Sequence, residues 1–399
     1  MMGKPKIRFK GYNEDWEQRK LNEVAEFNPK SDLPESFEYV DLESVVGTEM
    51  VSHRTESKET APSRAQRLAQ TGDVFFQTVR PYQRNNYLFT KPDNNYVFST
   101  GYAHMRPKID AEFLMCFLQT DSFVKVVLDS CTGTSYPAIN SNDLSNLEID
   151  LPTSEDEQRR IGCFITNLDH LITLHQHKCD ETKKLKKCML QKMFPKNGKK
   201  VPEIRFDGFA NDWEQRKLGE LAEIVGGGTP STSVDSYWDG DIDWYAPAEI
   251  GEQIYLESSQ RKITEEGLTK SSAKILPIGT VLFTSRAGIG KTAILLKEGC
   301  TNQGFQSIVP NKEKLDSYFI FTRSEELKRY GETVGAGSTF VEVSGKQMAN
   351  MELMMPKTMP EQQQIGEYFA NLDHLITLHQ HKCDELQNLK KYMLQNMFV

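Results

Sequence analysis

The chain has 399 residues, of which 38% are hydrophobic and 26% are charged; its formal net charge is −8 and its pI is about 5.6. This length allows two domains and additional long helices. No apolar run of about 18 residues is present, which excludes a membrane span, and the negative net charge argues against a protein that coats nucleic acid through bulk electrostatics.

The first residues, MMGKPKIRFKGYNEDW, are rich in basic side chains but contain no apolar core. They therefore do not have the pattern of a secretory signal. The seven cysteines show no framework spacing, which is typical of reduced thiols. Together these features predict a cytoplasmic protein.

Each half of the chain begins with the same pattern. Residues 5–11 and 202–208 share P-x-I-R-F-x-G, and the heptapeptide DWEQRKL at 15–21 returns unchanged at 212–218, an offset of 212−15=197. Farther along, NLDHLITLHQHKCDE at 167–181 returns unchanged at 371–385, an offset of 371−167=204. A unit of roughly 200 residues therefore occurs twice. The segments between these blocks differ almost everywhere, which is typical of two different readers on one duplicated scaffold.

The variable part of each half contains strand-like pieces, such as residues 73–77 and 280–284. Each variable part ends in a related segment, at residues 134–152 and 338–356, again 204 residues apart. The predicted organisation is a first variable domain at 1–153, a long helix at 154–194, a linker at 195–201, a second variable domain at 202–357 and a second long helix at 358–399.

A long amphipathic helix is predicted at the end of each half. Ser154 with Glu157, and Thr358 with Glu361, form the pattern of a capping box just after a proline. Apolar residues then recur at steps of three and four, which indicates a seam that packs against another helix, most simply the other copy. The predicted seam residues are Ile161, Ile165, Leu168, Ile172, His175, Cys179, Leu185, Met189, Ile365, Phe369, Leu372, Ile376, His379, Cys383, Leu389 and Met393.

Two like helices that pair across a pseudo-two-fold axis must run antiparallel. The predicted fold class is therefore α+β, with two α/β domains related by pseudo-two-fold symmetry and separated by two long helices in an antiparallel coiled coil. About 37 helical residues at 1.5 Å each give a rod of roughly 55 Å, with a variable domain at either end. Duplex DNA has its own two-fold backbone symmetry, so this geometry predicts a reader of two half-sites with a fixed gap.

Residues 287–292 read AGIGKT and resemble a phosphate-binding loop. The complete pattern requires glycine where Ser285 stands, and residues 293–296 continue as an apolar strand rather than a helix. We favour a tight turn that presents Ser285, Arg286 and Lys291 to a phosphate backbone.

The unchanged block also contains possible metal ligands, His175 and Cys179, with the copies His379 and Cys383. A four-ligand zinc site is geometrically possible, but polar residues within a seam commonly fix register instead. We favour the register role and predict no metal. No catalytic set is visible: the sequence has no G-x-G-x-x-G, no H-E-x-x-H and no Pro-Pro motif of the amino-methyltransferase type.

The variable domains do contain side chains suited to reading bases, since arginine pairs with guanine, and glutamine or asparagine with adenine. Small hydroxyls can bond phosphates. In the first domain the candidates are Arg80, Tyr82, Gln83, Arg84, Asn85, Thr134, Ser135 and Tyr136. In the second domain, where the glycines at 226–228 allow close backbone approach, they are Thr229, Ser231, Thr232, Tyr237, Trp238, Ser285, Arg286, Lys291, Gln303, Gln306, Ser338 and Thr339.

Nearly the whole chain resembles the specificity subunit of type I restriction–modification systems. The resemblance rests on the duplicated openings, on GGGTPSTS at 226–233, on TSRAGIGKTA at 284–293, and on the helix entries Pro152…Gln158…Ile161 and Pro356…Gln362…Ile365. The first domain departs from the family pattern, because Asn28-Pro29-Lys30 and residues 78–81 replace the glycine-rich stretches. Family DNA contacts therefore carry over more directly to the second domain.

The resemblance implies two target-recognition domains that each read one half of a bipartite double-stranded DNA site. It also implies helices that set the spacer and dock two methyltransferase subunits. The chain would be non-catalytic. S-adenosylmethionine, ATP and Mg²⁺ would be used by the methyltransferase and the restriction-translocase partners. Two other classes remain open from the residues alone: a structural adaptor that binds proteins through two different domains, and a nucleotide enzyme, which Ser285 disfavours.

Overall fold

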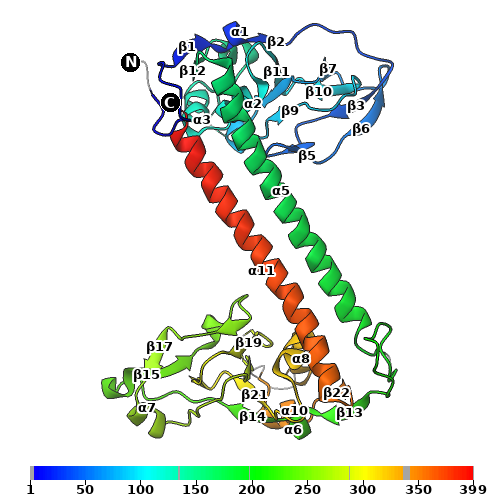
Figure 1. Cartoon of the computed structure of the whole chain (residues 1–399), viewed down its shortest axis with the longest axis vertical. Helices are drawn as coiled ribbons and strands as arrows, with labels where there is room; N and C mark the ends of the chain where they lie inside the picture. Colours follow the sequence, from blue (N-terminus) through cyan, green and yellow to red (C-terminus); the bar gives the residue numbers. More distant parts are fainter. Residues whose placement is uncertain (1–3, 134, 197, 287, 336–341, 399) are drawn as a thin grey trace. The chain divides into compact units, whose positions relative to one another are not determined.

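The computed structural model describes residues 4–133, 135–196, 198–286, 288–335 and 342–398. Two long helices, α5 (Glu155–Lys192) and α11 (Met359–Asn396), confirm the predicted pair. The chain divides into two compact units (Figure 1). Unit 1 comprises Met1–His177 with His379–Val399, and unit 2 comprises Lys178–Leu378. Each unit therefore contains one variable domain and half of each long helix. Among the described residues, no helix is both long and apolar enough to cross a membrane.

The domain of unit 1 has two four-stranded sheets, ordered β2-β11-β8-β9 and β6-β3-β10-β7, and a two-stranded ribbon of β1 and β12 that closes it. The strands are β1 Glu17–Lys20, β2 Ala25–Phe27, β3 Ser36–Val40, β4 Val45–Val46, β5 Glu49–Met50, β6 Arg54–Ser57, β7 Ala65–Leu68, β8 Val74–Gln77, β9 Tyr87–Leu88, β10 Tyr96–Ser99, β11 Tyr102–Pro107 and β12 Glu148–Leu151. The helices are α1 Leu21–Val24, the 3-10 turn η1 Pro81–Gln83, α2 Ala111–Leu118, α3 Asp121–Asp129 and α4 Ser141–Ser145.

The domain of unit 2 repeats this plan with sheets ordered β14-β21-β18-β19-β16 and β17-β15-β20 and a ribbon of β13 and β22. Its strands are β13 Glu214–Lys217, β14 Ala222–Gly226, β15 Trp238–Tyr245, β16 Tyr255–Leu256, β17 Arg261–Ile263, β18 Val281–Phe283, β19 Thr292–Leu295, β20 Cys300–Thr301, β21 Gln306–Pro310 and β22 Glu352–Met355. Its helices are α6 Leu218–Leu221, η2 Asp235–Tyr237, η3 Pro247–Glu249, α7 Glu265–Thr269, α8 Ser317–Thr322, α9 Ser324–Gly335 and α10 Gly345–Ala349.

Each long helix is anchored to its domain by an equivalent pair of side chains. Arg8 donates two hydrogen bonds to Glu157, at 2.6 and 2.8 Å, and Arg205 donates two to Glu361, at 2.7 and 2.9 Å. The predicted capping box is confirmed in one half at the first helix, where Ser154 Oγ accepts from the Glu157 N–H at 3.4 Å. The other half is wrong, because each glutamate side chain accepts from an arginine of the domain opening. Thr358 Oγ1 is buried without a hydrogen-bond partner. The P-x-I-R-F-x-G openings and the helix entries therefore form the same contact in both units.

Inside each unit the two helical halves pack in an antiparallel pair. In unit 1 Lys390 Nζ lies 2.5 Å from Asp169 Oδ1, and in unit 2 Lys186 Nζ lies 2.5 Å from Asp373 Oδ1. These pairs are the same contact 204 residues apart, since 390−186 and 373−169 both equal 204. Because a later residue of one helix meets an earlier residue of the other, the halves run in opposite directions.

The seam prediction is wrong at Leu185 and Leu389, whose exposed fractions are 41% and 37%. From Ile172 the alternation of three and four residues continues through His175 and Cys179 to Thr182 and Lys186, which are both half-buried. In the first helix the period thus places a threonine and an ion-paired lysine in the seam. In the second helix it places Leu386, which is 7% exposed, and the half-buried Lys390 there. The remaining predicted seam positions are buried or half-buried: Ile161, Ile165, Leu168, Ile172, His175, Cys179, Met189, Ile365, Phe369, Leu372, Ile376, His379, Cys383 and Met393.

Candidate nucleic-acid interface

In unit 1, two loops leave the same edge of the β2-β11-β8-β9 sheet. Both β2 and β8 pair antiparallel with β11, and their last residues, Phe27 and Gln77, lie opposite Met105 and Tyr102. Two strands antiparallel to the same neighbour run in the same direction. The chain after β2 and the chain after β8 therefore emerge side by side. We call this side of the domain the loop edge.

A third segment joins the loop edge and completes a surface with exposed aromatic and polar side chains. The backbone N–H of Arg80 donates to the carbonyl of Pro137 at 2.8 Å, which draws residues 135–138 against the loop that follows β8. The Arg80 guanidinium then lies 4.6 Å from the ring centre of Tyr136. Tyr82 and Tyr136 are 50% and 65% exposed. Such rings and a stacked guanidinium suit contact with nucleotides.

Two arginines in this loop adopt left-handed backbone conformations, Arg80 with φ 54° and Arg84 with φ 56°. Such conformations are uncommon for residues with a side chain and cost of the order of 1 kcal/mol or more. They enclose the 3-10 turn η1, which projects Tyr82 and Gln83. Strain that is held in place by surrounding contacts is typical of functional loops.

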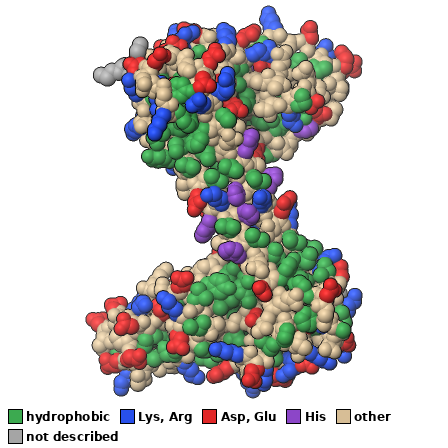
Figure 2. Space-filling model, viewed as in Figure 1, with side chains coloured by type: hydrophobic (Ala, Val, Ile, Leu, Met, Phe, Trp, Pro, Cys, Tyr) green, Lys and Arg blue, Asp and Glu red, His purple; other side chains and the backbone are tan. Residues whose placement is uncertain are grey.

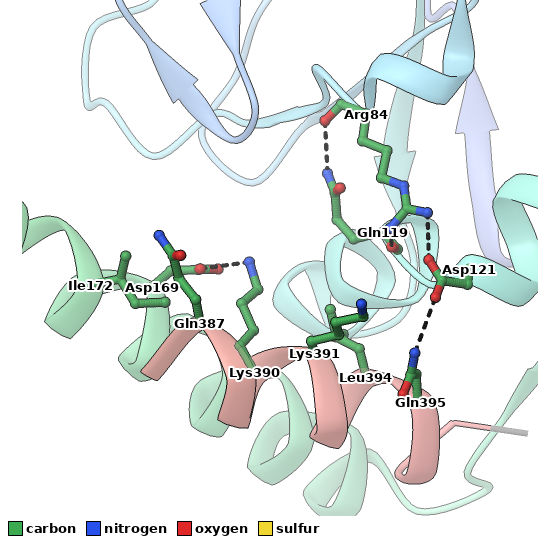
Figure 3. Close-up of a pocket in the computed structure, with 10 residues that line it drawn as sticks. All are labelled: Arg84, Gln119, Asp121, Asp169, Ile172, Gln387, Lys390, Lys391, Leu394 and Gln395. Carbon is green, nitrogen blue, oxygen red and sulfur yellow. Dashed lines mark hydrogen bonds and ion pairs between the residues drawn. The ribbon is translucent and has the colours of Figure 1, made fainter. Parts of the chain in front are cut away.

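Arg84 and Asn85, predicted to read bases, both make contacts within the domain, and Figure 3 shows those of Arg84. Arg84 Nη2 lies 2.5 Å from Asp121 Oδ1, and Nη1 donates to the Gln119 carbonyl at 3.0 Å. Asp121 also accepts from Gln395 of α11 at 3.3 Å. The Arg84 guanidinium beside it lowers the pKa of Asp121. Asn85 Oδ1 accepts from the Gly47 backbone at 2.8 Å.

These contacts predict that Asp121→Asn will lower DNA affinity as Arg84→Ala does, by about fivefold each, which corresponds to about 1 kcal/mol. The reason is that either change releases the loop from α3. If Arg84 contacted DNA directly, Asp121→Asn would free a cation and raise affinity. Binding of duplex DNA by the two single variants and by the double variant distinguishes these possibilities, because Asp121→Asn lowers DNA affinity in the first and raises it in the second. A double variant no weaker than either single variant would identify one shared contact.

Unit 2 has an equivalent loop edge. β14 and β18 both pair antiparallel with β21, where Gly226 lies opposite Gln306 and Val281 opposite Ile308. The loop after β14, the turn after β18 and the segment before β21 consequently meet. The Ser285 N–H donates to the Gly304 carbonyl at 2.8 Å, and Thr229 Oγ1 donates to Gln303 Oε1. Four of the predicted residues, Thr229, Ser285, Gln303 and Gln306, thus come together from segments far apart in the sequence.

The glycine-rich loop at 226–233 packs against its own domain. A Cβ on Gly227 would lie 1.9 Å from the Asn302 carbonyl oxygen, and one on Gly228 would lie 2.3 Å from Ser272 Oγ. The glycines are therefore required for packing inside the domain. Trp244 Nε1 donates to the Gly228 carbonyl at 2.9 Å, and Trp238 Nε1 donates to the Ser231 carbonyl at 3.1 Å.

Two residues of unit 2 that were predicted to contact DNA, Trp238 and Ser285, are buried. Trp238 is 7% exposed, with its ring against Trp244 and under the Arg261 guanidinium at 3.7 Å. Ser285 is fully buried, and its hydroxyl has no hydrogen-bond partner. Neither side chain is available to DNA without rearrangement, since each lies in the packing beneath the loop edge.

The remaining predicted side chains lie nearer the surface. Ser231, Thr232, Arg286, Lys291 and Gln303 are exposed, as are Gln83 and Ser135 of unit 1, while Tyr237 and Gln306 are half-buried. Arg286 Nη2 forms an ion pair with Glu342 at 2.8 Å. Thr134, Ser338 and Thr339 lie outside the described residues.

The segment that resembles a phosphate-binding loop is the turn of a β-hairpin. β18 and β19 pair antiparallel on either side of it, and the Lys291 N–H donates to Thr284 Oγ1 at 3.0 Å. A phosphate-binding loop of the nucleotide-hydrolase type leads into a helix, whose N-terminus binds the phosphate. The predicted strand after Lys291 is confirmed, so this turn lacks that helix.

The comparison with known families agrees with this architecture. The family model described as type I restriction modification DNA specificity domain matches residues 13–184 and again 210–388. The two matches cover most of the chain and coincide with its two repeats. The chain belongs to the type I restriction-modification DNA specificity family.

Relatives within this family match different shares of the chain. The specificity subunit of the type I restriction enzyme MjaIX from Methanocaldococcus jannaschii is 34% identical over 47% of the chain, but the match spans only 44% of that relative. The specificity subunit of the type I restriction enzyme HindI from Haemophilus influenzae is 20% identical over 82% of the chain and 86% of its own length.

A solved structure supports the fold of this family member. The crystal structure of the S subunit of a type I restriction-modification system from M. genitalium covers 100% of the chain and 99% of its own, with a TM-score of 0.67 and 15% identity. At this identity the likeness concerns the fold alone.

The repeated histidines and cysteines of this family member lie in the helical seam. His175 Nδ1 lies 2.9 Å from His379 Nδ1, which is a hydrogen-bond distance. The Cys179 and Cys383 thiols face the carbonyls of Ile376 and Ile172 at 3.8 and 3.6 Å. Among the described residues, no group of three or more His, Cys, Asp or Glu side chains could hold a metal ion.

Proposed function

We propose that this chain is the DNA-recognition subunit of a type I restriction-modification complex, in which each domain reads one half of a bipartite duplex site. The observation that supports this most is the pair of loop edges. Both are produced by the same strand order and register, yet their side chains differ. In unit 1 Arg80, Tyr82, Gln83 and Tyr136 lie at this edge, whereas unit 2 has a glycine-rich loop with Thr229 and Gln303. The same backbone arrangement with different side chains suits two domains that read half-sites of different sequence.

The helices would set the spacer and dock two methyltransferase subunits. Within the unchanged repeat, Leu171 and Leu174 are 43% and 47% exposed, and their copies Leu375 and Leu378 are 42% and 52% exposed. Figure 2 shows exposed hydrophobic and histidine side chains along the helical segments. Single exposed leucines are common, but a pair of exposed leucines one helical turn apart that occurs identically on two surfaces suits two identical partners.

The chemistry would belong to those partners. Methyltransferase subunits would use S-adenosylmethionine, and the restriction-translocase subunits would use ATP and Mg²⁺, in the cytoplasm. The negative net charge fits this division, because partner subunits can supply much of the contact with DNA phosphates.

Exchange of residues 1–153 for the corresponding domain of another family member should change one half of the recognised sequence and leave the other half intact. The donor must keep an arginine equivalent to Arg8, because Glu157 lies beyond the exchange point and is buried against it. Sequencing of methylated sites in cells that express the chimera with its methyltransferase partner measures the result. Exchange of residues 202–357 is the matched control and should change only the other half.

An unaltered methylated sequence after either exchange would show that the exchanged domain does not read DNA. Loss of all methylation would be resolved by measuring assembly with the methyltransferase subunit. An assembled but inactive chimera would contradict independent half-site reading.

A further inference from the structure

The first domain has a polar cavity at its loop edge that is lined in part by the half-buried side chain of Arg67. The cavity, of about 540 Å³, is lined by the loop after β2, Asn28–Leu33, and by Gln66 and Arg67 of β7. Arg67 Nε is buried and has no hydrogen-bond partner. Across the part of the chain that the structure describes, no carboxylate forms an ion pair with this side chain, and burial alone lowers the pKa of its guanidinium.

The position of Arg67 connects this cavity to the DNA-reading surface. β7 pairs antiparallel with β10, and the Arg64 carbonyl at its start accepts from the Thr100 N–H at 2.8 Å. The next residue, Gly101, accepts from the Thr78 N–H at 3.0 Å, where the loop after β8 begins. The loop after β2, which lines the cavity, leaves the sheet on the same side as the loop after β8, which presents Arg80 and Tyr82.

The Arg67 side chain is half-buried and its buried Nε has no hydrogen-bond partner, so part of its charge is desolvated without compensation in the free protein. Burial of a charge is tolerated when a partner of opposite charge and matching hydrogen bonds are present. The edge of a base is neutral and would leave the charge uncompensated, whereas a phosphate supplies both charge and acceptors. Lys30 adds a second, exposed cation to the rim, opposed by the exposed carboxylate of Asp32.

We propose that the cavity formed by Asn28–Leu33, Gln66 and Arg67 binds a backbone phosphate of duplex DNA, with Arg67 as its main ligand and Lys30 as a second. This inference depends on the proposed DNA-recognition function and adds a contact that fixes the first domain on its half-site. In unit 2 the corresponding loop packs directly onto Ser272, so this contact belongs to the first domain.

The test uses the full chain assembled with its methyltransferase subunit and a duplex that contains the methylated site. Arg67→Met should weaken binding by about tenfold, because one charge-assisted contact is lost. It should do so equally for all bases in the half-site, and it should reduce the salt dependence by about one phosphate contact. Thermal stability should hold or rise, since a partly desolvated charge that has no ion-pair partner among the described residues is removed.

Arg64→Met is the matched control, because it removes the same charge from an exposed position three residues away that does not line the cavity. Equal losses of DNA affinity in Arg67→Met and Arg64→Met would show that only the overall charge matters, and would overturn the proposal. A series of duplexes with single neutral methylphosphonate linkages supplies the second measurement. One linkage in the first half-site should weaken the wild-type complex but not further weaken Arg67→Met.

The outcomes separate the two proposals. If the wild-type complex shows no preference for any sequence, the proposed function fails. If it binds its site and Arg67→Met loses preference for one base pair, Arg67 reads a base. If inorganic phosphate at millimolar concentration competes with DNA in the wild type but not in Arg67→Met, the anion site is confirmed. Sequence-specific binding that is unchanged in Arg67→Met would overturn the phosphate site.

Discussion

Arg205→Met should lower the free energy of unfolding of unit 2 by about 3–5 kcal/mol, the typical cost of leaving one charge of a buried pair without its partner. The side chains of Arg205 and Glu361 are only 11% and 2% exposed. Arg205 also donates to the Asn211 carbonyl at 2.7 Å, and Trp213 Nε1 donates to the same glutamate at 3.0 Å. The substitution therefore leaves a buried carboxylate with a single neutral donor.

Arg216→Met is the control for this change. Arg216 pairs with Glu214 and Glu220 on the surface, and all three side chains are at least 33% exposed. Exposed pairs of this kind contribute about 0–1 kcal/mol. Denaturant unfolding, followed separately for each unit, should show a large loss for Arg205→Met and a small one for Arg216→Met. Adding Glu361→Gln to Arg205→Met should recover part of the loss, because the unpaired charge is removed.

Equal small losses at both arginines would show that the buried pair does not hold the helix entry. The functional consequence follows from position. Glu361 lies in the first turn of α11, and Arg205 lies in the opening of the domain. Loss of the pair should therefore make the angle at which α11 leaves its domain more variable.

The sequence predicted the long helices and the repeated domains because their signals are local or periodic. An unchanged block, an alternation of three and four residues and a proline just before each helix are readable without tertiary structure. The prediction is wrong at Leu185, which is 41% exposed, because the helical period and not the apolar side chain determines which residues face the other helix. Followed strictly, the period identifies Thr182 and Lys186 in its place.

The candidate interface was predicted less completely, because contacts between distant segments determine it. Arg84 has the residue type of a base reader, but Asp121, 37 residues later, engages it. Ser285 is buried by strand pairing that the local sequence does not reveal. Arg67 was missed for the opposite reason: within β7 it resembles any strand residue, and only the structure shows that its Nε is buried without a hydrogen-bond partner.

Leu171→Asp with Leu174→Asp should remove one of the two proposed methyltransferase subunits, and Leu375→Asp with Leu378→Asp should remove the other. Burial of one leucine side chain contributes about 1.5–3 kcal/mol, so two substitutions should weaken each contact by at least about a hundredfold. Placing a carboxylate in an apolar contact adds a desolvation cost. All four leucines are exposed, so the fold of each unit should be retained.

Native mass spectrometry of the co-expressed complex measures the number of bound subunits. We expect two for the wild type, one for either double variant and none for the quadruple variant. Lys184→Asp with Asn388→Asp is the control, since these exposed positions correspond to each other but differ between the copies. Two subunits retained by the quadruple variant would place the docking surface elsewhere. Loss of both subunits from a single double variant would instead show that the two faces cooperate, because identical independent sites lose their partners one at a time.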